Sequence, residues 1–88
     1  MSDTLKLRED EVVWQDVDDD LVVLDLRSST YFKLNGTGAL LWDLLREPTS
    51  QQDLVEALMS KYGIDEDRAT SDVDAFIDSL TQKKLLDR

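Results

Sequence analysis

Alternating apolar and polar positions predict three short β-strands in the first third of the chain. The segments are 11–15 (EVVWQ), 21–26 (LVVLDL) and 30–34 (TYFKL), and their β-branched and aromatic residues suit a pleated, half-buried surface. Polar segments at 16–20 (DVDDD) and 27–29 (RSS) separate the strands and are short enough for tight turns. The pattern therefore predicts a three-stranded antiparallel meander.

The same alternation predicts which side chains face the core. In the first strand, Val12 and Trp14 share one face and Val13 lies on the other. In the second strand, Asp25 is the single charged residue, and we expect it to face water. That assignment points the following side chains inward: Val22, Leu24 and Leu26.

Helical spacing of apolar residues replaces the alternation after Gly36 and predicts three helices. The first is expected over about residues 37–46, with Asn35 or Thr37 as its N-cap. It should end before Pro48, because the residue preceding a proline is disfavoured in the helical region.

The second helix is expected to start at Thr49 or Ser50, since Thr49 and Gln52 match a capping box. Gly63 supplies a C-terminal stop. The apolar stripe of this helix consists of Leu54, Val55, Leu58, Met59 and Tyr62.

The third helix is expected to start near Asp65. Glu66 and Asp67 in its first turn, and Lys83 and Lys84 at its other end, match the polarity of the helix dipole. The apolar stripe of this helix consists of Ala69, Val73, Phe76, Ile77 and Leu80.

Three strands followed by three helices predict a small α+β domain that resembles a winged helix. Its 88 residues provide for one domain with a modest core. We expect the domain to span residues 11–88, with Leu85 and Leu86 folding back onto the core. Residues 1–10 show no clear period and are expected to form a flexible lead-in.

The chain contains no cysteine and no histidine. The absence of both excludes Cys/His and Ser/His/Asp nucleophilic catalysis and removes the usual zinc ligands, so we expect no catalytic residue, metal site or cofactor. The N-terminus lacks the apolar segment of a signal peptide, and no stretch approaches the roughly 20 apolar residues of a membrane span. These features favour a soluble cytoplasmic protein with no membrane partner.

Acidic residues outnumber basic residues by 20 to 10, which gives a net charge of −10. Such a surface repels phosphate backbones and favours neutral or cationic partners, although solubility alone is an alternative explanation. A winged helix would read DNA with its third helix, but residues 65–78 contain Arg68 as their single basic residue. We therefore expect no nucleic-acid partner, and a small transcription regulator is disfavoured.

Asp16, Asp18 and Asp20 have the first three ligand spacings of a calcium-binding loop. The match then fails, because Leu21 and Arg27 occupy the positions that require glycine and glutamate. A solvated turn is the better interpretation of this segment.

The triplet Asp78-Ser79-Leu80 resembles the serine site of an acyl carrier protein, where serine bears a phosphopantetheine arm. That serine is exposed at the start of a helix, whereas Ser79 lies late in a periodic helix and Leu80 belongs to its apolar stripe. The strand-rich first third also has no counterpart in a four-helix carrier. An acyl carrier-like protein is therefore a remote alternative.

Several segments together resemble the PqqD-like proteins, the leader-peptide recognition domains of ribosomal natural-product biosynthesis. They are the LVVLDL strand, YFKLN leading into GTGALLW, the helix SQQDLVEALMSKYG, and the acidic and apolar helix ending in LTQKKLL. Their order and spacing between Val12 and Leu86 carry the resemblance, rather than any single motif. The chain is most similar to the stand-alone leader-binding partners of lasso-peptide biosynthesis.

The resemblance implies a non-catalytic protein that binds the leader of a precursor peptide and delivers it to a separate enzyme. That enzyme would be a transglutaminase-like leader peptidase or another modifying enzyme. A PqqD-type peptide chaperone for a radical SAM enzyme in quinone-cofactor biosynthesis is the alternative within the same fold.

In the family, the leader lies antiparallel to the third strand, in a groove closed by the third helix. Pairing of an extended peptide with an exposed strand edge is a recurrent mode of recognition. Carried onto this sequence, the peptide-binding residues are Thr30, Tyr31, Phe32, Lys33, Arg68, Ala69, Asp72, Val73 and Phe76. Asp72 would pair with a basic leader residue and Arg68 with an acidic one. Alternatively, Arg68 and Asp72 form a surface ion pair, and the following residues belong wholly to the core: Phe32, Val73 and Phe76.

Overall fold

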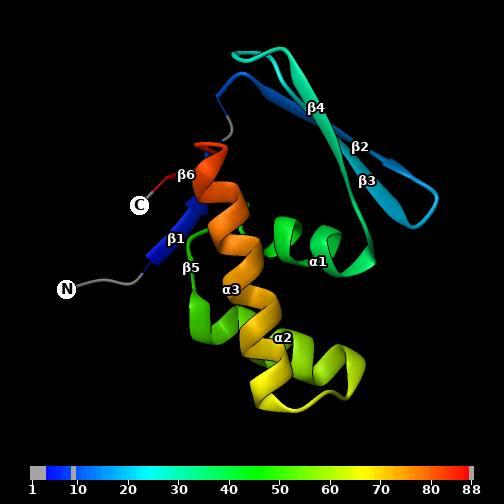
Figure 1. The fold of residues 1–88 in the computed structure, drawn as a ribbon, viewed down its shortest axis with the longest axis vertical. Helices are drawn as coiled ribbons and strands as arrows, with labels where there is room; N and C mark the ends of the chain where they lie inside the picture. Colours follow the sequence, from blue (N-terminus) through cyan, green and yellow to red (C-terminus); the bar gives the residue numbers. More distant parts are fainter. Residues whose placement is uncertain (1–3, 9, 88) are drawn as a thin grey trace.

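The computed structural model describes residues 4–8 and 10–87 of the chain. This described part has the α+β architecture that the sequence predicts, with six strands and three helices (Figure 1). The strands are β1 (Thr4–Leu7), β2 (Val12–Val17), β3 (Asp20–Asp25), β4 (Thr30–Leu34), β5 (Thr49–Ser50) and β6 (Leu86–Asp87). The helices are α1 (Gly36–Leu44), α2 (Gln51–Tyr62) and α3 (Glu66–Gln82).

The predicted meander is confirmed and forms the main sheet, in the strand order β2-β3-β4. Both pairs are antiparallel, and Val23 of β3 lies opposite Trp14 of β2 and Phe32 of β4. β2 continues two residues beyond the predicted strand, so that Asp18 and Asp19 make the turn. Asp18 has a φ of 58°, a left-handed conformation that aspartate tolerates better than most residues.

The predicted facing of β2 is also confirmed. Val12 is buried and Trp14 packs against the core, whereas Val13 is exposed. The rings of Trp14 and Trp42 meet edge to face, with 5.4 Å between their centroids. This geometry is favourable for aromatic pairs, and it packs the main sheet against α1.

The side chains of β3 face the opposite way from the prediction. Leu21 and Val23 are buried together with Asp25, which is only 6% exposed, whereas Leu26 is 50% exposed. Because strand side chains alternate between faces, placing Leu21 and Val23 in the core places Asp25 there as well. The predicted inward set is therefore wrong: Val22, Leu24 and Leu26.

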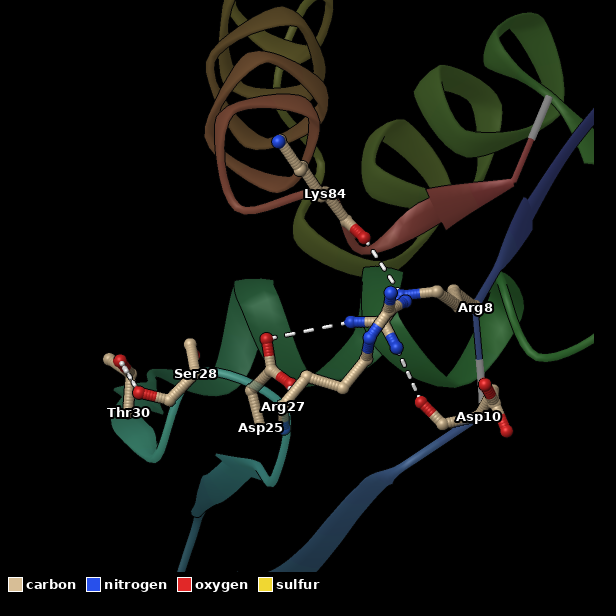
Figure 2. A network of polar contacts seen from close by, with 7 residues as sticks. All are labelled: Arg8, Asp10, Asp25, Arg27, Ser28, Thr30 and Lys84. Atoms are coloured by element: carbon tan, nitrogen blue, oxygen red, sulfur yellow. Dashed lines mark hydrogen bonds and ion pairs between the residues drawn. The ribbon is translucent and has the colours of Figure 1, made fainter.

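A network of polar contacts accommodates the buried Asp25 (Figure 2). The guanidinium of Arg8 lies 3.5 Å from its carboxylate, and the backbone N–H of Arg27 donates to it over 3.1 Å. Burial by itself raises the pKa of Asp25, but the Arg27 N–H, the charge of Arg8 and the Ser28 hydroxyl together outweigh it. The pKa of Asp25 therefore lies below its ordinary value, and the carboxylate is ionised in the folded protein.

Residues 4–7 form β1, so the predicted flexible lead-in over residues 1–10 is wrong for this segment. β1 pairs antiparallel with β5 on one side and with β6 on the other, which makes a second, small sheet. Leu5 and Leu7 are buried in the core. A four-residue strand is too short to show a clear period, and its partners lie more than 40 residues away along the chain. Residues 1–3 and 9 of the predicted lead-in lie outside the described residues.

Each of the three helices in the described residues begins at a side-chain oxygen that accepts a backbone N–H. Asn35 caps α1, Ser50 caps α2 and Asp65 caps α3, at distances of 2.9 to 3.1 Å. Thr49 lies in β5, so the capping box predicted from Thr49 does not form. Gly63 ends α2 as predicted, with a φ of 64° that glycine adopts readily.

The core lies between the two sheets and the helices. Leu85 is completely buried and β6 pairs with β1, which confirms that the C-terminal residues fold back. The apolar stripes of α2 and α3 face this core, except that Tyr62 is 42% exposed and Phe76 is only half-buried. Within the described residues, no helix is both long and apolar enough to cross a membrane.

Candidate functional site

β4 lies at the border of the main sheet and runs directly into α1 (Figure 1). Its inner edge pairs with β3 along the whole strand, from Thr30 opposite Asp25 to Leu34 opposite Leu21. No described strand pairs with its other edge. β4 therefore has backbone donors and acceptors available for a further strand.

The hydrogen-bond pattern identifies the residues of β4 that face this open edge. The N–H of Leu26 donates to the carbonyl of Glu11 over 2.8 Å, so the backbone groups of Leu26 point toward β2. In an antiparallel sheet these directions alternate, and Asp25 therefore points its groups toward β4. Along β4, the residues opposite such positions of β3 direct their own backbone groups toward β3: Thr30, Phe32 and Leu34. Tyr31 and Lys33 consequently direct their N–H and C=O groups to the open edge.

A hollow of about 490 Å³ lies between the end of β4, the start of α1 and one face of α3. Apolar surface from Leu34 and Phe76 contributes to it together with the charged side chains of Arg68 and Asp72. The residues around it are Lys33, Leu34, Asn35, Thr37, Gly38, Leu41, Arg68, Asp72, Ala75 and Phe76. A strand added to β4 would lie along this hollow.

Gly38 of α1 lies close to both Leu34 of β4 and Phe76 of α3 at the floor of the hollow. A Cβ at this position would lie 3.1 Å from the Cβ of Leu34 and 3.5 Å from the ring of Phe76. The first distance is shorter than an ordinary van der Waals contact, so a Cβ at this position would require Leu34 to shift by a few tenths of an ångström. Leu34, Gly38 and Phe76 thus lie close together and form the apolar floor of the hollow.

Arg68 and Asp72 lie one helical turn apart and both line the hollow. They are not within ion-pair distance of each other, and no other described side chain forms a salt bridge with either. The predicted alternative, a surface pair between them, is therefore not observed. Both charges are therefore available to a ligand. Arg68 and Asp72 also line a second hollow of about 180 Å³, together with Thr37, Tyr62 and Ile64.

The structure brings together some of the nine predicted residues and separates others. Lys33, Arg68, Asp72 and Phe76 line the hollow. Thr30 and Tyr31 are exposed on β4, and Phe32 is half-buried on its core-facing side. Two predicted residues belong wholly to the core, because they lie on the face of α3 that packs inward: Ala69 and Val73.

Six residues of the hollow were not predicted: Leu34, Asn35, Thr37, Gly38, Leu41 and Ala75. Leu34 could have been found, because it shares a strand face with Phe32 at a spacing of two. Thr37 and Gly38, at the start of α1, line the hollow only because of how this helix packs against β4, and the sequence pattern does not encode that packing.

The residues that suggested other chemistry lie elsewhere. Asp16, Asp18 and Asp20 lie on the β2–β3 hairpin, and no group of three acidic side chains in the described residues is placed to hold a metal ion. Ser79 lies in the second half of α3 and is half-buried, and its hydroxyl accepts a hydrogen bond from Lys83 over 3.3 Å. Neither arrangement resembles the site that its sequence motif suggested.

Solved structures with similar folds include two that contain leader peptides. One is described as TbiB1 in complex with the TbiA(beta) leader peptide; it is 34% identical, covers 93% of this chain and 94% of that chain, and has a TM-score of 0.83. The other is described as lasso peptide synthetase B1 complexed with the leader peptide; it is 31% identical, covers 96% and 98% of the two chains, and has a TM-score of 0.81. A comparison with curated proteins found no match. The sequence profile described as coenzyme PQQ synthesis protein D (PqqD) matches residues 20–86, and the chain therefore belongs to the PqqD family.

Proposed function

We propose that this protein binds the leader segment of a ribosomally made precursor peptide, which adds as a strand to the open edge of β4. The observation that carries the proposal is the juxtaposition of this edge with a partly apolar hollow on α3. The similarity of this protein, over almost the whole chain, to two proteins solved with leader peptides supports the same class of ligand.

The leader would run antiparallel to β4, as the family resemblance implies and as the neighbouring strands of the main sheet already do. Tyr31 and Lys33 would then each exchange two backbone hydrogen bonds with it. A net contribution of about 0.5–1.5 kcal/mol per bond is modest, so side-chain anchors must supply much of the affinity. The floor formed by Leu34, Gly38 and Phe76 is suited to an apolar anchor.

Charge gives the groove its selectivity. Asp72 is half-buried at the hollow and would pair with a basic residue of the leader, while Arg68 would pair with an acidic one. Complementary charges affect specificity and association rate more than total affinity. The open edge of β4 would therefore supply backbone pairing that does not depend on the leader sequence, and the hollow would supply a small number of selective contacts.

The protein is proposed to be a non-catalytic cytoplasmic partner that delivers the bound precursor to a separate enzyme. In lasso-peptide biosynthesis this enzyme would be a leader peptidase, and the similarity to lasso peptide synthetase B1 favours that pathway. The match to the PqqD profile supports the second candidate, a peptide chaperone for a radical SAM enzyme of quinone-cofactor biosynthesis.

The test is a titration of the protein with leader peptides, in which NMR monitors the backbone amide signals. The probes are the TbiA(beta) leader peptide and the leader of any precursor encoded beside the gene for this chain, with scrambled versions as controls. We expect saturable shifts concentrated at Tyr31, Lys33 and the hollow-facing residues of α3. Binding that leaves the β4 amides unchanged, or no binding of either leader, would contradict the proposal.

A further inference from the structure

The side chain of Lys83 is held beside β4 at a distance from the hollow. Its Nζ lies 5.2 Å from the centroid of the Phe32 ring and donates a hydrogen bond to Ser79 over 3.3 Å. Lys83 is exposed, and no carboxylate of the described residues forms an ion pair with it. A positive charge thus lies over an aromatic ring with no anionic partner among residues 4–8 and 10–87.

The directions of β4 and α3 place Lys83 at a defined end of the groove. Leu34 and Phe76, the latter in the middle of α3, both lie beside Gly38, whereas Phe32, earlier in β4, lies by Lys83 just after α3 ends. The strand and the helix therefore run in opposite directions, as Figure 1 also shows. A peptide antiparallel to β4 would pass the hollow first and reach Lys83 further toward its own C-terminus.

The register of such a peptide follows from the backbone pattern. Because Tyr31 and Lys33 supply the edge hydrogen bonds, the peptide residue opposite Phe32 occupies a non-hydrogen-bonded position. Residues paired in this way approach to about 4.5 Å between Cα atoms, and their side chains lie on the same face of the sheet. The side chain opposite Phe32 would therefore meet the Phe32 ring and the ammonium of Lys83.

The peptide residue two positions earlier would lie opposite Leu34, on the same face. There it meets the apolar floor formed by Leu34, Gly38 and Phe76. The intervening residue points to the outer face of the sheet, beside the exposed side chain of Lys33. The two inward positions thus differ in chemistry, one apolar and the other cationic.

From this geometry we propose that Lys83 and Phe32 form a charge-selective subsite for an acidic side chain of the bound peptide. This inference rests on the proposed function and extends it. The bound segment then reads, from N to C, an apolar residue, a variable residue and an aspartate or glutamate. Lys83 is the specificity-determining residue at the third of these positions.

The test begins with selection of a random-peptide library, displayed on phage, against the full chain, with each selected peptide mapped by amide NMR. We expect peptides that shift the Tyr31 and Lys33 amides to carry an apolar residue and an acidic residue at a spacing of two. A synthetic version of the consensus would then be measured with Lys83→Glu, Lys83→Gln and, as the matched control, Lys84→Glu. Lys84 is an exposed neighbour whose substitution makes the same charge change.

Lys83→Glu is expected to weaken binding about three- to tenfold, the range of an exposed ion pair and its reversal, while Lys84→Glu leaves the dissociation constant unchanged. A peptide with lysine in place of its acidic residue should recover affinity for Lys83→Glu, and Lys83→Gln should lose the preference between the two peptides. Peptides that bind the β4 edge with no acidic preference, or with one that survives Lys83→Gln, would overturn this inference and leave the proposed function intact. Selection of no peptide that shifts the β4 amides would overturn both.

Discussion

The guanidinium of Arg8 lies 3.5 Å from the buried carboxylate of Asp25, which joins the end of β1 to the end of β3 (Figure 2). Arg8 also donates through Nε to the carbonyl of Lys84 over 2.9 Å. One side chain thus contacts two segments that are far from it in the sequence, the end of β3 and the end of α3. It connects the small sheet and the end of α3 to the main sheet, whose outer strand carries the proposed binding edge.

Replacement of Asp25 by asparagine should destabilise the protein at neutral pH by about 1–3 kcal/mol, because it removes the charge that satisfies a partly buried arginine. The stabilisation should also depend on pH. The pKa of Asp25 is lowered in the folded state, so its contribution is complete above the unfolded value, near 3.8, and is lost as the pH falls through the folded value. Denaturant unfolding at several pH values measures both effects.

Wild-type protein should therefore lose more stability than Asp25→Asn when the pH is lowered below about 4. Asp19→Asn, at an exposed turn position, is the control and should differ little from wild type. Equal acid sensitivity of the wild-type and Asp25→Asn proteins would refute the assigned role of the carboxylate.

Asp25 also marks the limit of sequence-based prediction in this fold. Helix and strand types followed from periodicity and capping residues, because Asn35, Ser50 and Asp65 cap their helices through local contacts. The facing of β3 depended on Arg8, which approaches from outside the meander. A charged residue was assigned to water because its distant partner is not visible in a local pattern.

The candidate site was also predictable only in part. The family resemblance identified its strand and helix, but which side chains of these elements face the hollow depends on how they pack together. Val73 and Asp72 are neighbours on α3, yet one is completely buried and the other lines the hollow. The sequence pattern does not say which residues of β4 face the open edge, and the hydrogen bond between Leu26 and Glu11 identifies them.

Charge reversal at Asp72 should change binding without unfolding the protein. Asp72→Lys is expected to weaken binding severalfold for a leader with a basic residue at the hollow, because attraction becomes repulsion. The free energy of unfolding should change by less than about 0.5 kcal/mol, as is usual for a surface substitution. Calorimetric titration and thermal unfolding measure the two quantities.

Asp78→Lys makes the same charge change at an exposed position outside the hollow and serves as the control. If the two variants weaken binding equally, the effect is one of net charge, and Asp72 makes no specific contact with the leader.

The protein alone should leave a bound precursor intact, and it should accelerate cleavage by a separate leader peptidase. Tethering the leader near the peptidase raises its effective concentration there. Initial rates followed by mass spectrometry, with and without this protein, provide the measurement. The prediction would be contradicted if the purified protein alone hydrolysed the precursor, or if adding it left the rate of the peptidase unchanged.

Proline substitution at two positions of β4 tests the central claim, that the leader pairs with its open edge. Proline removes a backbone N–H, and strands tolerate this where the N–H faces away from the sheet. Lys33 directs its N–H outward, whereas Thr30 directs its N–H to β3. Lys33→Ala keeps the outward N–H while it removes the side chain and its ion pair with Asp20.

The deciding measurement is the dissociation constant of the leader for Lys33→Pro, determined together with its melting temperature. We expect this variant to keep a melting temperature close to that of Lys33→Ala and to bind the leader about tenfold more weakly or worse, because one backbone bond is lost and its acceptor on the leader is left unpaired. Thr30→Pro should instead lose about 1–3 kcal/mol of stability, since it breaks a bond within the sheet. If Lys33→Pro is folded and binds the leader as tightly as Lys33→Ala, the leader does not pair with the edge of β4.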